Sequence, residues 1–228
     1  MKQKSFSKII AKLRSHYGEP PPPKTTDALG IILYENIAYL VSDEKRDAAF
    51  DALKKKTGLK PTKILAASGE ELNRIARLGG GHPELRGARL QEIARIVLHD
   101  FEGDLNNALQ LPLPQAKKSL QLFPSIGLPG AEKILLFTRT YPVLALESNG
   151  LRVLLRLGFG EEGKNYARSY ASVQEDLKGE IGSDFDFLIS AYQLLRKHGQ
   201  ELCRRTKPQC ESCPLQSSCA YYSRLRKI

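Results

Sequence analysis

All four cysteines of the chain lie between residues 203 and 219, in the pattern C-x6-C-x2-C-x5-C: Cys203, Cys210, Cys213 and Cys219. Thiolates this close together repel one another unless a cation neutralises their charge. Two disulfides, a structural zinc ion or a cubane [4Fe–4S] cluster would each account for such a set of thiols. The rest of the chain has no secreted character, which disfavours disulfides, and it offers a single C-x2-C pair where structural zinc usually takes two. The residues alone leave zinc and iron–sulfur open.

A second pattern that could bind a ligand is the predicted helical hairpin at 113–140. Its helices, 113–123 and 129–140, meet at Phe123-Pro-Ser-Ile-Gly127. The plain interpretation is an ordinary helical hairpin. In the functional interpretation, Ile126 anchors the turn in the core and the amides around Gly127 point outward at the start of the second helix. Such amides, together with the helix dipole, form an anion site that grips a phosphate without reading sequence.

These two patterns, in this order, resemble the endonuclease III family of DNA glycosylases. The cysteine spacing is similar to the cluster signature of that family, and the hairpin is similar to its L-P-G-x-G helix-hairpin-helix, with Ser125 in place of the middle glycine. The resemblance extends from about residue 25 to residue 222. It implies that the cysteines hold a [4Fe–4S] cluster with a structural role. It also implies that the hairpin contacts DNA through Ser125, Ile126, Gly127 and Gly130.

The same resemblance points to Glu147 as a catalytic carboxylate. Glu147 stands at the acidic position of the family pattern V-D-x-x-x-x-R-V, where the family has Asp, and Arg152 and Val153 fit the pattern. A carboxylate there would stabilise oxocarbenium character on the sugar and orient the attacking water. The structural alternative is a helix N-cap. The Schiff-base lysine of the bifunctional members corresponds to Pro129, which has no amine, so lyase activity is not expected.

Glu35 is a second candidate, because a carboxylate inside an apolar helix is costly unless it is paired or functional. Ile-Leu-Tyr-Glu35 resembles the W-L-x-E of adenine glycosylases, whose Glu protonates the departing purine, so Glu35 is a candidate general acid. A carboxylate that bridges neighbouring helices is the alternative. Tyr34 and Tyr39 are candidates for a base pocket or, more plainly, for the core. The family's intercalating Gln corresponds to Leu40, so His82, in a glycine-rich turn, is a candidate probe of the gap left by a flipped base.

Basic residues stand next to the cysteines, with Arg204, Arg205 and Lys207 between Cys203 and Cys210. In a loop fixed at both ends, such cations meet DNA phosphates with little loss of entropy. The alternative is that they offset the charge of an anionic cluster. The net charge of +10 agrees with a polyanionic partner, although a solvated basic surface would give the same number.

The composition of 228 residues, 41% of them hydrophobic, suffices for one large or two small domains. The sequence has no apolar run of membrane-spanning length, and its first residues, Met-Lys-Gln-Lys-Ser-Phe, lack the apolar core of a signal peptide. We therefore expect a monomer in the cytoplasm, associated with the nucleoid if the protein is bacterial, with no membrane partner.

The elements that position these residues are predicted to be helices throughout, because strand patterns are nearly absent and helical periodicity is widespread. Ser68 and Glu71 form a capping-box pattern, and Leu85 is expected on the core face of its helix. The other helices are expected at 4–16, 27–41, 42–56, after 61, and at 72–78, 84–101, 149–157, 163–178 and 184–198. The resemblance implies an all-α, two-lobed helix-hairpin-helix glycosylase fold. Residues 25–141 would form a six-helix lobe, and residues 1–24 with 142–228 a cluster lobe.

The sequence thus predicts a base excision repair DNA glycosylase, monofunctional, that hydrolyses the N-glycosidic bond of a damaged or mismatched base flipped from double-stranded DNA. The alternative is a non-catalytic iron–sulfur protein that recognises damaged or bent DNA. The departures from the family pattern at Ser125, Pro129 and Glu147 favour that alternative. A zinc-bearing nucleic-acid module is the third hypothesis. No motif specifies the base.

Overall fold

The structure, a computed structural model, describes residues 5–226. These residues form helices and no strand, and their one β feature is an isolated bridge between Tyr39 and Gly80. The predicted all-α class is confirmed. Residue 4, where the first helix was expected to begin, and residues 1–3 and 227–228 of the predicted cluster lobe lie outside the described residues. None of the described helices has the length and apolar character needed to cross a membrane.

Internal contacts divide the chain into two compact units. The hairpin unit runs from Pro23 to Tyr141, and the cysteine unit combines the chain up to Pro22 with the part from Pro142 onward. The boundary between the units at residue 22 falls within the four successive prolines from Pro20 to Pro23, which have no backbone donors and keep the chain extended.

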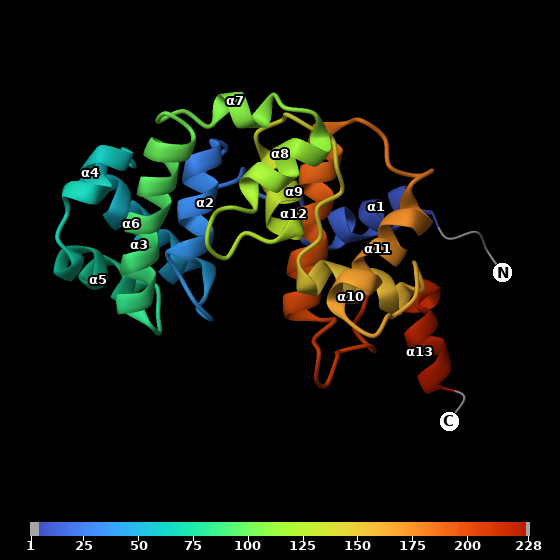
Figure 1. Cartoon of the computed structure of the whole chain (residues 1–228). Coiled ribbons are helices and arrows are strands. Elements are labelled where there is room, and N and C mark those ends of the chain that lie inside the picture. The colour runs from blue at the N-terminus through green and yellow to red at the C-terminus, as the bar shows by residue number, and fades with distance from the viewer. Residues whose placement is uncertain (1–4, 227–228) are drawn as a thin grey trace. The chain divides into compact units, whose positions relative to one another are not determined.

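The hairpin unit is built around a short apolar helix, α2, which packs against α3, α6 and α9 (Figure 1). Most of α2 is buried, and its first turn is held by the Asp27 side chain, which accepts a hydrogen bond of 2.7 Å from the amide of Gly30. The predicted capping box is present, since Ser68 and Glu71 exchange their side-chain and backbone bonds. The helices of the unit are α2 (Ala28–Asn36), α3 (Asp43–Thr57), α4 (Pro61–Ala66), α5 (Gly69–Leu78), α6 (Pro83–Asp100), α7 (Asn106–Leu109), α8 (Leu113–Leu120) and α9 (Leu128–Phe137).

Two expectations for this unit were wrong. The helix predicted over 27–41 ends at Asn36, because the next residues pair with a second loop: the amide of Tyr39 donates to the carbonyl of Gly79 at 2.9 Å. Leu85 is not in the core but 51% exposed, since Pro83 begins the helix and Leu85 lies in its first, outward-facing turn.

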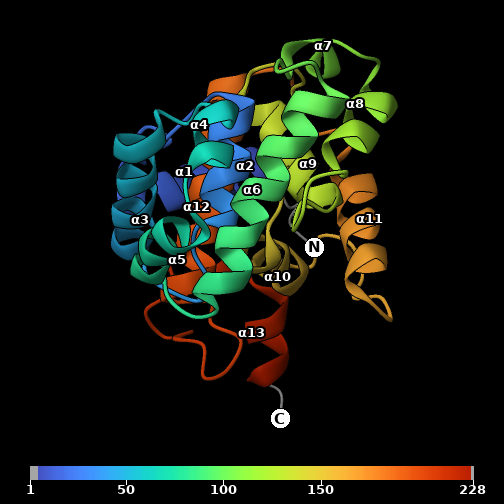
Figure 2. The ribbon, with the colours of Figure 1, turned by 60° about the vertical axis from the view of Figure 1, so that its left-hand side comes forward.

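The cysteine unit is centred on α12, which contacts α1 and α10, while α10 also contacts α11 and α13. Both views show the cysteine loop, in red, leaving α12 and passing below α10 into α13 (Figures 1 and 2). Phe6, Leu13 and Leu195 are fully buried in the core of this unit. Its helices are α1 (Phe6–Tyr17), α10 (Ser148–Leu157), α11 (Tyr166–Leu177), α12 (Phe185–Glu201), the short 3-10 helix η1 (Gln216–Ser218) and α13 (Ala220–Leu225).

Candidate catalytic residues and cysteine centre

Glu147 is the N-cap of α10, and both of its carboxylate oxygens are engaged. Oε1 accepts a hydrogen bond of 2.6 Å from the amide of Gly150, and Oε2 accepts one of 2.7 Å from Asn149 Nδ2. The backbone of Glu147 is extended, as an N-cap requires, and the residue is half-buried. Glu147 therefore has the N-cap role that was the structural alternative to catalysis. This role is compatible with catalysis, because the same two bonds hold a negative charge in one fixed orientation.

Asn149 and Arg152 connect this carboxylate to the cysteine loop. Asn149 Oδ1 accepts a bond of 2.7 Å from Arg152 Nη2, while Arg152 Nε donates to the carbonyl of Cys203 at 2.9 Å. A further bond of 2.8 Å runs from Arg152 Nη2 to the carbonyl of Gly199. Burial lowers the pKa of the Arg152 guanidinium from its ordinary value. The carboxylate and the first cysteine thus belong to one hydrogen-bond network within the cysteine unit.

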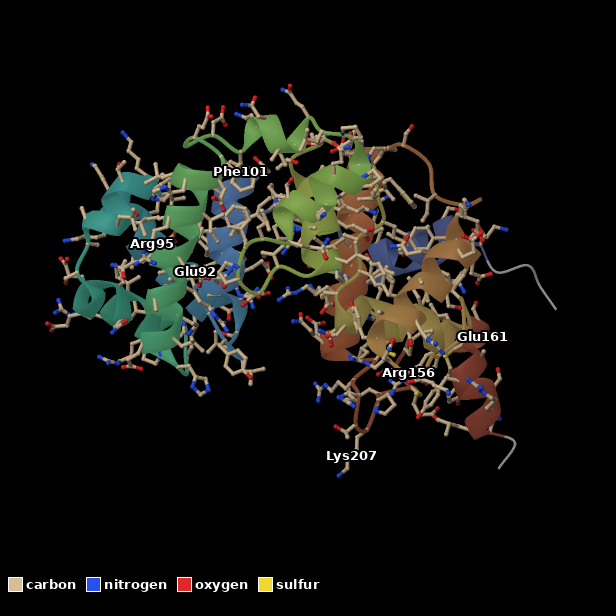
Figure 3. The ribbon with its side chains drawn as sticks, in the orientation of Figure 1. Glu92, Arg95, Phe101, Arg156, Glu161 and Lys207 are labelled. Atoms are coloured by element: carbon tan, nitrogen blue, oxygen red, sulfur yellow. The ribbon has the colours of Figure 1, made fainter. Side chains whose placement is uncertain are left out.

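Arg156, one turn further along α10, holds the next residues of the loop. Its Nη1 donates to the carbonyl of Arg204 at 2.7 Å and lies 3.4 Å from Cys203 Sγ, and its Nη2 donates to the carbonyl of Arg205 at 3.1 Å. The guanidinium also stacks over the ring of Tyr221, 4.6 Å from its centroid. Figure 3 shows Arg156 beside the loop. Two neighbouring arginines of one helix therefore fix the backbone of the loop.

The side chains of Arg204, Arg205 and Lys207 are exposed. Their backbone is restrained: Lys207 has a φ of 50°, and the amide of Gln209 closes the loop onto the carbonyl of Leu202 at 2.9 Å. Figure 3 shows Lys207 projecting from the outer end of the loop. The three predicted DNA-binding cations are therefore carried into solvent on a fixed backbone.

The four cysteines line one cavity and are free thiols. Burial, together with the charges of the other three cysteines, raises the pKa of the Cys213 thiol to about 11. Burial and the neighbouring Cys219 and Cys203 likewise raise the pKa of Cys210. The walls of the cavity include Leu202, Pro208 and Tyr221 beside the cysteines. Thiols that raise one another's pKa are stabilised as thiolates once a cation neutralises them.

This donor set fits a polynuclear cluster. Among the described residues, no group of three or more His, Cys, Asp or Glu side chains is arranged to hold a metal ion. A [4Fe–4S] cluster is held by four thiolates around a wide core, and four thiols around one cavity supply that arrangement. The residues that would hold it are Cys203, Cys210, Cys213 and Cys219.

In the hairpin unit, the turn between α8 and α9 has the shape that an anion site needs. Ser125 adopts a φ of 63°, a conformation that a glycine takes at no steric cost, and Ile126 is 5% exposed. Gly127 is the N-cap of α9, and a Cβ on Gly130 would lie 3.3 Å from Ile126 Cγ2. Ile126 and Gly130 therefore pack the turn, while Ser125 and Gly127 are exposed. The first amides of α9 have no partner inside the helix.

Asn36, at the end of α2, attaches this turn to the helix. It is 2% exposed, and its Nδ2 donates to the carbonyls of Ile32 and Pro124 at 3.0 Å and 2.9 Å. A buried amide that reaches the turn from 88 residues away fixes the position of Pro124 and hence of Ser125.

Glu35 is paired. Its Oε1 accepts a hydrogen bond of 2.7 Å from Lys133 Nζ, joining α2 to α9, and the two side chains are 28% and 13% exposed. Lys133 Nζ also lies 5.3 Å from the centroid of the Phe137 ring. This is the arrangement of a carboxylate that bridges two helices.

Tyr34 and Tyr39 have different surroundings. The Tyr34 hydroxyl donates to Asp47 at 2.7 Å and its ring packs edge-on against Phe50, so it serves the contact between α2 and α3. Tyr39 is 50% exposed, with its ring 5.6 Å from that of His82. The two tyrosines are thus not in one environment.

Tyr39, Leu40 and His82 form an exposed tip made of two loops, which we call the two-loop tip. Leu40 is 85% exposed, and both Leu40 and His82 have positive φ, 53° and 54°. Bulky residues keep such backbone only where the surroundings hold it. The loops meet so closely that a Cβ on Gly80 would lie 2.7 Å from the carbonyl of Tyr39.

Arg86, which sequence reasoning missed, fixes the two-loop tip. It is 2% exposed, and its guanidinium donates to the carbonyls of Ile37, Gly80 and Gly81, the last two at 2.6 Å and 2.8 Å. Burial lowers its pKa from the ordinary value. Arg86 lies four residues before Leu90 and seven before Ile93, both buried, so its place on the core face of α6 was the available signal.

No family model matches the chain. Among curated proteins it is similar to endonuclease III of Rickettsia conorii, with 24% identity over 216 residues that cover 90% of this chain and 92% of the relative. It is also similar to endonuclease III of Thermotoga maritima, with 24% identity over 208 residues that cover 91% and 90%. Among solved structures, a trapped endonuclease III–DNA covalent intermediate matches 98% of this chain and 100% of that one, with a TM-score of 0.76 and 17% identity.

The chain has the endonuclease III-like helix-hairpin-helix glycosylase fold. The resemblance predicted from the hairpin and the cysteines is confirmed by the match of both sequence and fold over nearly the whole length. A thermostable thymine-DNA glycosylase has the same fold, with a TM-score of 0.66 over 96% of this chain and 20% identity. The same fold is thus found in an endonuclease III and in a thymine-DNA glycosylase.

Proposed function

We propose that this endonuclease III-like protein is a monofunctional DNA glycosylase of base excision repair, with Glu147 as its catalytic carboxylate. The observation that supports this most is the fixed geometry of Glu147, whose two oxygens are bonded to the amide of Gly150 and to Asn149. The relatives are glycosylases or endonuclease III enzymes, and the solved neighbours include complexes with DNA.

The chemistry of Glu147 follows from its bonds. Both of its partners donate to the carboxylate and hold it in one orientation. As the bond between the sugar and the base lengthens, positive charge develops on the sugar, and a fixed anion stabilises that charge more than it stabilises the ground state. Glu147 also serves to orient the attacking water. The glutamate is longer than the family aspartate, and Asn149 supports the added length through Oε2.

The covalent route of the bifunctional members is not available to Pro129. It lies in the first turn of α9, where a proline fits without strain, and it has no amine. The amine of Lys133, one turn further along α9, is paired with Glu35. Hydrolysis is therefore the route that the residues support. We propose two roles for Glu35: it joins α2 to α9 through Lys133, and it is a candidate proton donor.

Binding to double-stranded DNA is proposed to involve three surfaces. Ser125, Ile126, Gly127 and Gly130 form a turn whose free amides suit a phosphate. Arg204, Arg205 and Lys207 add cations on a restrained backbone. The two-loop tip, including His82, offers apolar and aromatic side chains that suit the gap in a base stack. Tyr39 is the better placed of the two candidate pocket tyrosines, because it is exposed.

The four cysteines are proposed to bind a [4Fe–4S] cluster. When bound, the cluster would cross-link the loop and supply a redox-active centre. Arg152 and Arg156 then hold the loop from α10, and through Asn149 the same helix holds Glu147. The proposed role of the cysteine centre is therefore to keep α10 and the basic loop in place.

Release of a base from defined duplexes tests this function. The panel carries uracil or thymine, each placed opposite guanine, and 1,N6-ethenoadenine. A curated relative is named thymine/uracil-DNA glycosylase, and a 3-methyladenine DNA glycosylase of similar fold was solved with 1,N6-ethenoadenine bound. Duplexes are incubated with the protein, and half of each sample is treated with alkali. We expect cleavage after alkali only, and no adduct with borohydride. Cleavage without alkali together with a trapped adduct would contradict the monofunctional proposal.

The second candidate is a non-catalytic iron–sulfur protein that recognises damaged or bent DNA. It is favoured by the replacements at Ser125, Pro129 and Glu147. The same panel separates the two candidates: tight binding to a lesion duplex without base release, unaffected by Glu147→Ala, supports the binding protein. Iron and sulfide analysis of aerobically purified protein separates both from a zinc-bearing module.

A further inference from the structure

His198 connects two helices of the cysteine unit to one of the cysteines. It lies on α12 and is 1% exposed. Its Nδ1 is 3.0 Å from the hydroxyl of Tyr17, and its Nε2 is 3.5 Å from Cys213 Sγ. Both ring nitrogens of a buried imidazole therefore have a partner, one from α1 and one from the cysteine loop.

We propose that Tyr17, His198 and Cys213 form a hydrogen-bond relay that fixes His198 as a donor to the Cys213 thiolate, and that this bond tunes the reduction potential and the retention of the cluster. The inference rests on the cluster assignment in the proposed function. His198 and Tyr17 are positioning residues in this scheme, since neither is a ligand.

The direction of the relay follows from which of its three groups can donate a hydrogen bond and which can accept one. A cysteine that binds iron is a thiolate and only accepts. Nε2 of His198 must then carry the hydrogen, so that Nδ1 of the neutral ring accepts, and the hydroxyl of Tyr17 must donate to it. With a protonated Cys213 both directions are possible, whereas ligation leaves this single arrangement. The loaded protein therefore holds one tautomer of His198.

Tyr17 is held in place to act on His198. It is the last residue of α1, which packs on α12, and its ring lies edge-on to the imidazole with centroids 5.9 Å apart. Lys197 Nζ lies 5.1 Å from the centroid of the phenol ring. The relay thus links the position of α1 on α12 to the hydrogen bond at the cysteine loop. Hydrogen bonds to the sulfurs are among the factors that set iron–sulfur potentials, and loss of an outer-shell partner typically costs about 10–100-fold in metal affinity.

The test compares Tyr17→Phe, His198→Leu, the double variant and His198→Gln with the wild type, all as full-length holoprotein. Tyr141→Phe is the matched control, because it removes a phenol hydroxyl that is bonded to the carbonyl of Leu111 in the hairpin unit, not to the relay. Iron and sulfide content, the midpoint potential followed by electron paramagnetic resonance, and the rate of iron loss to a chelator are measured. Thermal unfolding followed by circular dichroism monitors the fold.

We expect Tyr17→Phe and His198→Leu to move the midpoint potential to more negative values and to lose iron about 10-fold faster. The double variant should match His198→Leu, because Tyr17 acts only through His198. His198→Gln keeps an amide donor for the sulfur and should restore the potential. Tyr141→Phe should behave as the wild type. If His198→Leu does not fold, the relay is tested by comparing Tyr17→Phe and His198→Gln with the wild type.

Two results would overturn the relay, and they are distinguishable. If Tyr17→Phe and His198→Leu hold iron and sulfide with wild-type potential and wild-type iron loss, the relay is wrong and the proposed function stands. If the wild-type protein releases a base but contains no iron or sulfide, the cluster assignment and the relay both fall while the glycosylase proposal stands.

Discussion

Replacing Glu147 by Gln removes the charge of the proposed catalytic carboxylate with almost no change in shape. Gln keeps an oxygen for the amide of Gly150, but its amide nitrogen then faces the Asn149 donor that now lies 2.7 Å from Oε2. If Asn149 flips to satisfy Gln, it turns its own NH2 toward Arg152 and loses the bond of 2.7 Å there. Either way one hydrogen bond of this network is lost.

The two effects of Glu147→Gln have different magnitudes. One unsatisfied, half-buried polar group costs about 1–3 kcal/mol of stability. For a chain of this size, each 1 kcal/mol lowers the melting temperature by about 2–4 °C. The loss of a preorganised charge at the reacting centre costs about 10²–10³-fold in rate. We therefore expect a folded protein, slightly less stable, whose rate of base release falls by at least about 100-fold.

The assay is single-turnover base release on the best substrate of the panel, with the affinity for duplex DNA measured by fluorescence anisotropy. Asp184→Asn is the matched control, since Asp184 is also a carboxylate N-cap of the cysteine unit and accepts from the amides of Asp186 and Phe187. Asn keeps an oxygen for both amides at this exposed N-cap, so the variant should change the stability little and leave the rate unchanged. A Glu147→Gln protein that is folded, binds DNA and releases base at the wild-type rate would refute the role given to Glu147.

Three further predictions concern other residues. Pro129→Lys places an amine at the family's Schiff-base position, and we expect strand cleavage without alkali and an adduct trapped by borohydride. A folded variant that forms no adduct would show that α9 does not present this position to the sugar. Arg86→Met leaves three carbonyls of the two-loop tip without their charged donor, and we expect a loss of about 3 kcal/mol or more in the free energy of unfolding by urea, whereas the exposed Arg77→Met should cost little. The bond from Lys56 lowers the pKa of Glu71 below 4.5, so the stability that the ionised Glu71 contributes is present above that pH and is lost as the pH falls. Glu71→Gln should therefore flatten the pH dependence of the free energy of unfolding between about 3 and 5. An unchanged slope would contradict the role given to the Lys56 bond.

Local features of the fold were predictable from the sequence because their causes lie within a few residues. Ser68 and Glu71 close their capping box within one helical turn, and Pro129 begins a helix through its own ring geometry. The order of hairpin, acidic residue and cysteines was likewise visible, and it was enough to indicate the fold.

The features that failed or were missed depend on residues far apart in the sequence. The apolar neighbours of Leu40 predict that the helix continues through it. The pairing of Tyr39 with Gly79 and the bond from Arg86 to Ile37 end the helix earlier. The pair between Glu35 and Lys133 spans 98 residues. No periodicity in the sequence records such a contact, because each partner alone looks like an ordinary charged residue on a helix.

The network around α10 shows the same limit within the candidate site. Glu147 was identifiable as an acidic position, but its bonds to Asn149, and through Arg152 to Cys203, required the coordinates. These bonds connect the N-cap of one helix with a loop that follows another, and the bond from Arg152 to Cys203 spans 51 residues. They explain how a single helix serves both the carboxylate and the cysteine centre.

The most direct test of the glycosylase proposal is detection of the free base. Duplexes with uracil or thymine opposite guanine, or with 1,N6-ethenoadenine, are incubated with wild-type protein and with Glu147→Gln, and the released base is identified by mass spectrometry. The account predicts that the wild type frees a base from at least one duplex, in an amount equal to the alkali-labile sites, and that Glu147→Gln frees about 100-fold less in the same time. Binding of these duplexes by the wild-type protein without any free base would contradict it.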